Sequence, residues 1–346
     1  MTTQDVRPPD GAVRLTEWTT CGGCAAKWAP GRLDALLATI AAGGATNEGD
    51  ETLVIGLDGF DDAAVLQLRD DLALVSTTDF FPPMVDDPSD YGAIAAANAC
   101  SDVFAMGGRV VIALNIAAFP ERLGAATVDA IVSAAAAVVA EAGGVVAGGH
   151  TIRSEEPIFG LAVQGLVHPA EVLTKGGARP GQAIVLSKPL GTGIVLQGGS
   201  EDAKRAAVAG MRALNRRSSQ VLRALGARIG AVTDVTGFGL CGHGWEVADR
   251  SGVALRFRTG TLPLYPGALE AARAGVRTGG DRRNREHLAG RVTSAATGER
   301  EALAFDPQTS GGLLATVDPS VLDDLVAKGF VVVGDVAEGP AHVELQ

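Results

Sequence analysis

Aromatic side chains are scarce in this sequence: phenylalanine, tyrosine and tryptophan together make up 4% of its 346 residues. Glycine, by contrast, occurs 46 times. The core must therefore consist of small aliphatic side chains, with many turns or close approaches of the backbone. Hydrophobic residues account for 47% of the chain and charged residues for 20%, which excludes an intrinsically disordered protein. A chain of this length is expected to form two domains.

Cysteine and long apolar stretches are also rare. Four cysteines in 346 residues are too few for the disulfide framework of a small secreted protein. The most apolar stretch, Ala130–Ala140, ends at Glu141 and is shorter than the ~18 residues that cross a membrane. The first residues, MTTQDVRPPDGAVR, contain no apolar signal-peptide core. We therefore expect a cytoplasmic protein with no membrane partner.

Basic residues are outnumbered, with 29 lysines and arginines against 40 acidic residues and a net charge of −11. An acidic surface argues against nucleic acid and anionic membranes as partners. An anionic ligand would have to be bound through metal ions or through backbone N–H groups.

The hydrophobic pattern divides the chain into three parts. Residues 1–56 have few periodic apolar positions, and we expect a flexible, glycine-rich N-terminal segment. A regular pattern of strands and helices covers residues 57–172. The glycines and prolines of Thr174–Gln182 indicate a boundary to a second domain, residues 173–346. Neighbouring strand pairs mixed with helices predict an α+β fold in both domains.

Periodicity and capping residues predict the main elements of the two domains. Strands are expected at Leu72–Phe80, Val110–Phe119, Val145–Ala147, Ile158–Val167, Ala183–Ser187, Ala231–Thr233, Val253–Arg258, Leu313–Val317, Val331–Val336 and His342–Leu345. Helices are expected from Ser89 or Asp90 to Met106, and at Ala125–Ala142, Glu201–Leu225, Leu240–Arg250 and Pro266–Ala274.

The sequence Cys21-Gly-Gly-Cys24-Ala-Ala-Lys27 is the first candidate for chemistry. A CxxC pair is often half of a zinc site, but the other cysteines, Cys100 and Cys241, are isolated. A redox dithiol normally opens a helix inside a βαβ unit, whereas this pair lies in a leading segment. The third interpretation is one reactive cysteine, Cys24. A lysine three residues away favours the nucleophilic thiolate, and glycines let the loop close over a ligand.

Acidic residues at the ends of apolar runs are the second candidate. A single aspartate in such a position is commonly a turn or cap residue. Several of them in one domain tend to meet at one rim, and Asn98 and Asp102 share a face of the expected helix. Closely spaced carboxylates repel one another unless a cation lies between them, and such oxygen ligands suit Mg²⁺ with bound phosphates. The candidate acids are Asp61, Asp62, Asp79, Asp102 and Asp234.

Glycine-rich stretches are the third candidate. Residues 237–242 match G-x-G-x-x-G, but no acidic residue follows ~20 positions later, which argues against a dinucleotide-binding fold. A P-loop is absent from the sequence. Gly148-Gly149-His150-Thr151 follows a short expected strand, and its backbone N–H groups are suited to contact phosphate or ribose.

Nine segments in collinear order, from about residue 14 to the C-terminus, resemble the selenophosphate synthetases. This family is one branch of the superfamily that includes aminoimidazole ribonucleotide synthetase, and the Cys/Lys loop points to this branch. The segments are GCAAK (23–27), DDAAV (61–65), STTDFFPPMVDDP (76–88), NACSDVFAMGG (98–108), AGGHT (147–151), PIFGLAVQG (157–165), TDVTGFGLCGH (233–243), RTGGDRRN (277–284) and DPQTSGG (306–312).

The resemblance implies a homodimer whose chains have the two-domain α+β fold of the superfamily, with ATP bound in a cleft lined by the first domain. It implies an enzyme that converts selenide, ATP and water into selenophosphate, AMP and orthophosphate with Mg²⁺. Carried over by position, Cys24 and Lys27 are catalytic, and Asp62, Asp102 and Asp234 bind metal. The implied ATP-binding residues are Lys27, Gly59, Phe60, Asp61, Asp79, Asp102, Gly149, His150 and Thr151.

Two alternatives stay open at the level of sequence. One is another ATP-using enzyme of the same superfamily, such as a cyclase or a small-molecule kinase. The other is a non-catalytic protein that carries selenium or a metal on Cys21 and Cys24. An AMP product that requires selenide would exclude the first, and ATP turnover would exclude the second.

Overall fold

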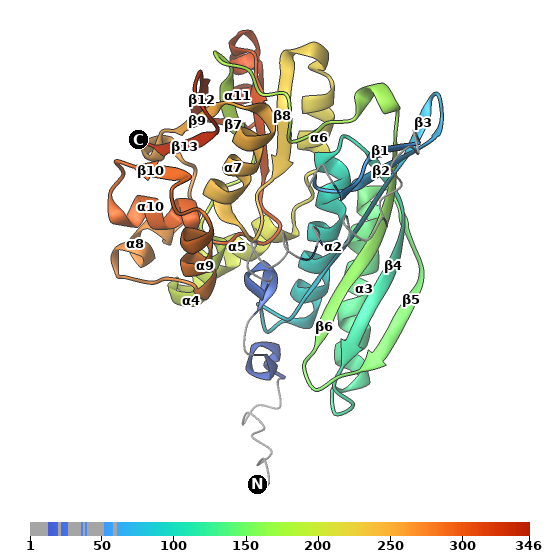
Figure 1. Cartoon of the computed structure of the whole chain (residues 1–346). Coiled ribbons are helices and arrows are strands. Elements are labelled where there is room, and N and C mark those ends of the chain that lie inside the picture. Colours follow the sequence, from blue (N-terminus) through green and yellow to red (C-terminus); the bar gives the residue numbers. More distant parts are fainter. Residues whose placement is uncertain (1–12, 20–21, 27–35, 37–38, 40–51, 58–60) are drawn as a thin grey trace.

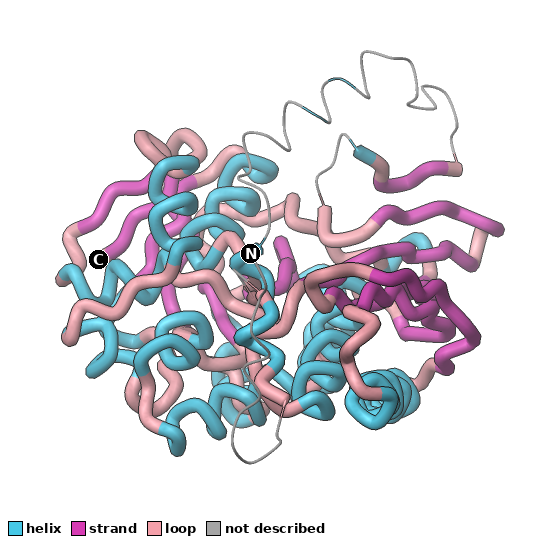
Figure 2. The backbone as a smooth tube through the Cα atoms, turned by 90° about the horizontal axis from the view of Figure 1, so that it is seen from below, coloured by secondary structure: helices cyan, strands magenta, loops and turns pink. Residues whose placement is uncertain are grey.

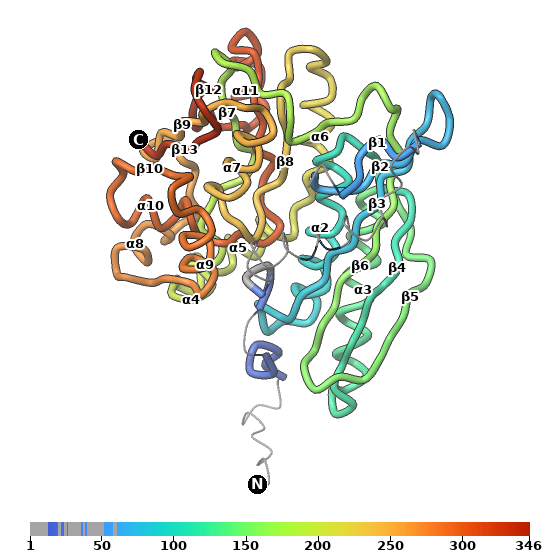
Figure 3. Tube along the Cα trace, viewed as in Figure 1, coloured from blue at the N-terminus to red at the C-terminus, as the bar shows by residue number. Residues whose placement is uncertain are grey.

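The computed structural model describes residues 13–19, 22–26, 36, 39, 52–57 and 61–346. Two mixed β-sheets lie side by side, each with helices packed against it, and the chain passes from the first to the second near residue 175 (Figure 1, Figure 3). The expected α+β class is therefore confirmed. The prediction of a flexible segment concerns residues that lie largely outside those described.

The first domain is built on a six-stranded sheet. Helices α2 (Pro88–Ala105) and α3 (Ala125–Ala142) pack side by side on one face of it (Figure 2). Only β4 and β5 pair in parallel; the other neighbours are antiparallel. In spatial order the strands are β1 (Leu53–Ile55), β2 (Ala64–Arg69), β3 (Leu72–Phe81), β6 (Ile158–Val167), β4 (Arg109–Phe119) and β5 (Val145–Arg153).

Helix α2 is the central element of the first domain, and 14 of its 18 residues are buried. Alanine and glycine let its neighbours approach closely: a Cβ on Gly92 would lie 2.0 Å from the carbonyl oxygen of Ile131 in α3. The expected start at Ser89 or Asp90 is wrong. Asp87 caps the helix by accepting a hydrogen bond from the backbone N–H of Asp90 at 2.9 Å. Pro88 takes the first helical position, where proline needs no hydrogen-bond partner.

Helix α3 has the expected bounds and ends at Gly143, whose φ of 96° lies in the left-handed region that favours glycine. By length and mean hydropathy, 1.6 over 18 residues, it is the one described helix that could cross a membrane. It packs along α2, however, and Ile131, Ala135 and Val139 are fully buried in the first core. These contacts are those of a helix in a folded globular domain.

The second domain is built on a seven-stranded sheet. In spatial order its strands are β10 (Val292–Ser294), β13 (His342–Leu345), β9 (Ala254–Phe257), β12 (Val331–Ala337), β7 (Ala183–Leu186), β11 (Leu313–Val317) and β8 (Ile229–Asp234). The helices are α4 (Thr192–Gly198), α5 (Glu201–Arg212), α6 (Arg216–Arg223), α7 (Gly239–Ser251), α8 (Ala268–Arg273), α9 (Gly279–His287), α10 (Gly298–Phe305) and α11 (Leu322–Ala327). Since β8 pairs antiparallel with β11, the glycines of residues 237–242 do not belong to a parallel dinucleotide-binding unit.

Two expectations about continuity are wrong. The long helix predicted at Glu201–Leu225 is broken into α5 and α6, because Ala213 is extended and the Asn215 side chain donates hydrogen bonds to Ser101 and Gly311 elsewhere in the fold. The strand expected at Val145–Ala147 does not end before the glycine-rich stretch, since residues 148–151 continue it as part of β5.

The two domains share buried contacts. Ala105, in the last turn of α2, is fully buried among second-domain residues such as Val232 and Leu313, and Met211 of α5 packs into the first core. The arrangement places one end of α2 and the end of β8 next to each other.

Candidate functional site

A cavity of about 520 Å³ lies where the two domains meet. Strand β3 and helix α2 form one wall, and Lys175, the end of β8 and the start of α7 form the other. Six of the lining side chains carry carboxylates. The lining residues are Asp61, Asp62, Thr77, Thr78, Asp79, Phe80, Asp102, Lys175, Asp234, Thr236, Phe238, His243 and Glu246.

Helix α2 and strand β3 present two matched polar pairs. Asn98 donates a hydrogen bond to Asp79, and the Thr77 hydroxyl donates to Asp102 at 2.6 Å. Four helical residues rise about 6 Å, nearly the length of two strand residues, so the i, i+4 pair on the helix meets the i, i+2 pair on the strand. The shared face predicted for Asn98 and Asp102 is confirmed.

Asp102 is a half-buried carboxylate among other carboxylates. Burial raises its pKa well above the ordinary value, and the neighbouring charges of Asp234, Asp79 and Asp62 raise it further. The hydrogen bond from Thr77 opposes this but does not cancel it. A bound cation would stabilise the charged form of a carboxylate in such surroundings.

Asp234 brings a carboxylate of the second domain to α2. It ends strand β8, is 1% exposed and accepts a hydrogen bond from Ser101 at 2.6 Å. Ser101 in turn accepts from Asn215 at 2.8 Å. This chain of hydrogen bonds fixes the orientation of the Asp234 carboxylate, as is usual for metal-binding carboxylates.

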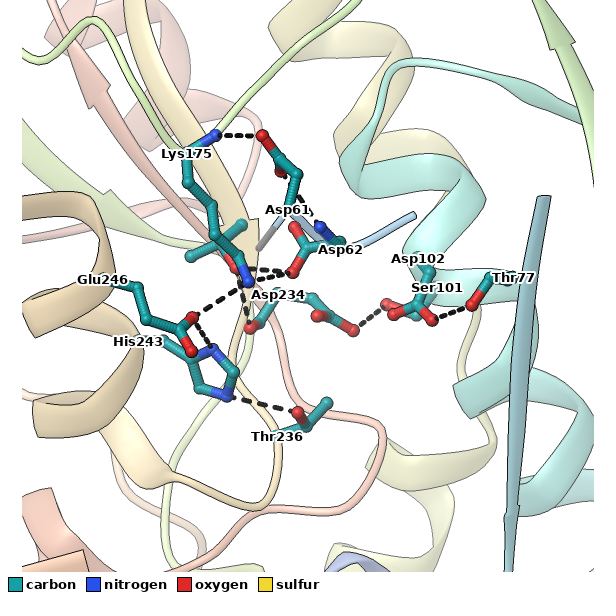
Figure 4. A network of polar contacts seen from close by, with 11 residues as sticks. Asp61, Asp62, Thr77, Ser101, Asp102, Lys175, Asp234, Thr236, His243 and Glu246 are labelled. Carbon is teal, nitrogen blue, oxygen red and sulfur yellow. Dashed lines mark hydrogen bonds and ion pairs between the residues drawn. The ribbon is translucent and has the colours of Figure 1, made fainter. Parts of the chain in front are cut away.

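Asp61 and Asp62 are held from both domains, as Figure 4 shows. The Asp61 carboxylate accepts the backbone N–H groups of Asp62 at 3.0 Å and Lys175 at 3.2 Å. Burial and the Asp62 charge together raise the pKa of Asp61 to about 6. The Oδ1 atom of Asp62 lies 3.0 Å from Nζ of Lys175 and accepts a hydrogen bond from Thr233 at 2.9 Å.

Three ionisable residues of the cavity wall were not predicted from the sequence: Lys175, Glu246 and His243. Nζ of Lys175 lies 2.9 Å from Oε2 of Glu246, and His243 Nδ1 lies 3.1 Å from the same oxygen. Because a carboxylate only accepts, Nδ1 donates; the other ring nitrogen lies 3.2 Å from the Thr236 hydroxyl (Figure 4). The His–Glu spacing of three residues on a helix was the available signal.

The donor set of the cavity fits Mg²⁺. Oδ2 of Asp62 is buried and has no hydrogen-bond partner in the described part of the chain. Within that part, no three His, Cys, Asp or Glu side chains converge into a complete metal site. Mg²⁺ is usually bound by one or two carboxylates, with water and substrate phosphates supplying the other ligands. Asp62, Asp102 and Asp234 line one cavity and suit that mode.

The short segment that carries Cys24 is anchored at the end of β3. It forms a 3₁₀ turn, Gly23–Ala26, and the N–H of Gly23 donates to the carbonyl of Pro82 at 2.9 Å. A Cβ on Gly23 would lie 2.8 Å from the hydroxyl of Thr309 in the second domain. The backbone of Cys24 is thus near the domain junction, because Pro82, which anchors Gly23, directly follows the last residue of β3. The predicted site residues Lys27, Gly59 and Phe60 lie outside the described residues.

The predicted nucleotide-binding residues Gly149, His150 and Thr151 lie elsewhere. They are exposed in β5, the edge strand of the six-stranded sheet, and are not among the described residues that line the cavity. Gly149 must be glycine, since a Cβ would lie 2.3 Å from the carbonyl oxygen of Asn115. Their role in binding ATP stays a prediction.

Comparison with known proteins covers both domains. Residues 60–167 match the family described as AIR synthase related protein, N-terminal domain, and residues 179–341 match its C-terminal domain. The fold resembles that of the thiamine monophosphate kinase of Aquifex aeolicus, with a TM-score of 0.66, 19% sequence identity and coverage of 96% of this chain and 98% of that one. That likeness concerns the fold alone.

Two curated relatives are much more similar in sequence. The selenide, water dikinase of Caldanaerobacter subterraneus is 41% identical over 94% of this chain and 96% of its own. That of Pelobacter propionicus is 42% identical over 96% of this chain and 97% of its own. The resemblance inferred from nine short segments thus extends over nearly the whole length. The chain belongs to the selenide, water dikinase family within the AIR synthase-related proteins.

Proposed function

We propose that this protein makes selenophosphate from selenide, ATP and water, and releases AMP and orthophosphate. The observation that carries the proposal is a cavity with six carboxylates from both domains, next to the strand end that anchors the Cys24 segment. The family supports the same reaction.

The charge of the cavity supports a requirement for divalent cations. Six carboxylates and one lysine line it, so a triphosphate would be repelled unless cations were bound with it. Asp62, Asp102 and Asp234 would hold Mg²⁺, which on binding neutralises charge on the phosphates and polarises the transferred group. Asp61 and Asp79 border the same space and are proposed to contact the nucleotide.

Cys24 and Lys27 are proposed to act on the selenium substrate and on the phosphate chain. Hydroselenide is already an anion near neutral pH, so the reaction needs little help from a general base. It needs a nucleophile confined and aimed in line at the γ-phosphorus, which is mainly a matter of positioning. Cys24 would hold the selenium, and the ammonium of Lys27 would offset charge that develops on the transferred group.

We further propose a cytoplasmic homodimer. Ile112 and Leu114 of β4 and Phe80 of β3 alternate with buried residues, so they face away from α2 and α3 and are 36–49% exposed. Val145 and Ile152 of β5 are 57% and 55% exposed. A partner subunit on this apolar face would lie next to His150. The mass in solution, with and without an Ile112→Asp substitution, tests the assembly.

The function is tested by incubating the protein anaerobically with ATP and selenide and following ATP and its phosphorus-containing products by phosphorus NMR. We expect selenophosphate and AMP from the native protein, and neither from Cys24→Ser, which should still bind ATP. Cys21→Ser is the matched control and should stay active if one thiol is sufficient. Release of ADP without need for selenide would instead identify a small-molecule kinase, and stoichiometric selenium binding without ATP turnover would identify a carrier.

A further inference from the structure

Lys175 occupies an unusual position for a lysine. It belongs to the stretch between the domains, and its side chain is 6% exposed. Its ammonium pairs with Asp62, which precedes β2 in the first domain, and with Glu246 of α7 in the second. The group is a fixed positive charge inside the cavity.

Lys175 is also the only lysine or arginine among the described residues that line the cavity. It engages one oxygen of Asp62 and leaves the other, Oδ2, buried without a hydrogen-bond partner within the described chain. A divalent cation on Oδ2 would share this carboxylate with the ammonium. Two cations on one buried carboxylate repel each other strongly, because the surroundings screen them poorly.

A polyphosphate removes this conflict. Its anionic oxygens can lie between the metal ion and the ammonium and interact with both. Metal binding without nucleotide is therefore opposed by Lys175, whereas binding together with nucleotide is not. By thermodynamic reciprocity, the nucleotide must raise metal affinity by the same factor by which the metal raises nucleotide affinity.

We propose that Lys175 makes the binding of divalent cations at Asp62 conditional on the polyphosphate. This inference rests on the proposed function, since it takes the cavity to be the metal–nucleotide site. Lys175 is a positioning residue here: it acts through Asp62 and through the order in which ligands can bind. Glu246 supports it by sharing the ammonium, and His243 keeps Glu246 oriented.

The test measures Mn²⁺ binding, from the electron paramagnetic resonance signal of free Mn²⁺, to full-length protein with and without a non-hydrolysable ATP analogue. Lys175→Met removes the charge at similar length. We expect this variant to bind Mn²⁺ several-fold more tightly than the native protein when no nucleotide is present. The factor by which the analogue raises Mn²⁺ affinity should shrink. Lys175→Arg should keep the native behaviour.

Glu246→Gln provides a variant with the opposite expected sign. The ammonium is then no longer shared, Asp62 is held more firmly, and nucleotide-free Mn²⁺ binding should weaken several-fold. If Lys175→Met alone does not fold, Glu246→Gln is compared with the double variant Lys175→Met/Glu246→Gln, which has the net charge of the native protein. The double variant should bind Mn²⁺ more tightly than Glu246→Gln. Lys204→Met, which removes an exposed lysine of α5, controls for net charge and should change nothing.

The results separate two kinds of failure. If Lys175→Met and Glu246→Gln both weaken Mn²⁺ binding, the ion pairs are only structural and the inference is wrong. Unchanged Mn²⁺ affinity in both variants also overturns it while leaving the proposed function intact. If the native protein binds no Mn²⁺ even with the analogue, the metal–nucleotide assignment of the cavity fails, and the inference fails with it.

Discussion

Alanine at Gly22 or Gly23 should detach the cysteine-bearing segment without unfolding the protein. A Cβ on Gly22 would lie 2.1 Å from the carbonyl oxygen of Pro83 and 2.9 Å from the Cα of Met84. Both atoms belong to the backbone, so no side-chain rotation relieves the clash. At Gly23 the φ of +64° adds a conformational cost, and the Thr309 hydroxyl would have to move.

The expected magnitude follows from these geometries. A left-handed conformation costs an alanine about 1–2 kcal/mol, which lowers the docking equilibrium constant roughly 5- to 30-fold. We expect selenide-dependent AMP formation by Gly23→Ala to fall by up to that factor, because Cys24 is the next residue and the rate follows the docked fraction. Gly22→Ala should lose more, since its contact is shorter and lies against backbone.

Initial rates of selenide-dependent AMP formation, measured beside thermal unfolding, provide the assay. Gly298→Ala is the matched control, because a Cβ there meets nothing within 4 Å. The unfolding temperature of both test variants should stay close to that of the control, since undocking relieves the clash without opening either core. Full activity in Gly22→Ala would refute the anchoring of Cys24 at the end of β3.

Two further substitutions act on charge. Asp102→Asn should weaken Mg²⁺–ATP binding roughly tenfold or more, equivalent to about 1.4 kcal/mol. It should also stabilise the ligand-free protein, because like charges and burial oppose the charged form of the native carboxylate. Calorimetric titration measures the first effect and urea unfolding the second. Lys188 donates to the carbonyls of Ala213 and Ser310, and burial lowers its pKa to about 7. The unfolded state therefore binds more protons than the native state between pH 7 and 9, so the free energy of unfolding should rise by about 2 kcal/mol over that interval relative to Lys188→Met. Urea unfolding at both pH values measures this, and an equal change in the two proteins would contradict it.

Short-range sequence patterns predicted the helices and strands whose ends depend on residues nearby in the chain. Helix α3 and strand β6 have the expected bounds, because apolar periodicity determines them together with the glycines that flank α3 and the prolines near both ends of β6. The break between α5 and α6 was not predictable in this way. Asn215 ends the helical run by bonding to Ser101 and Gly311, which are about a hundred residues away in the chain. Tertiary hydrogen bonds of this kind leave no periodic signature.

The candidate site shows the same division. The aspartates were found because acids after apolar runs stand out, and five of them line one cavity. Lys175 was missed because it lies among the glycines of the domain boundary, where a lysine usually faces solvent. Its partners Asp62 and Glu246 come from two different domains, so only the assembled fold shows that its charge is buried.

The hydrogen bond between Ser101 and Asp234 joins residues 133 positions apart. During synthesis the first domain can fold while the second is still being made. Until the second domain is made, the aspartates of the first domain lack the other residues that line the cavity, and the Cys24 segment lacks its neighbour Thr309. A truncated product would present carboxylates and a cysteine without a closed binding space. On the proposed site, only a completed chain would bring a nucleotide and a selenium anion together.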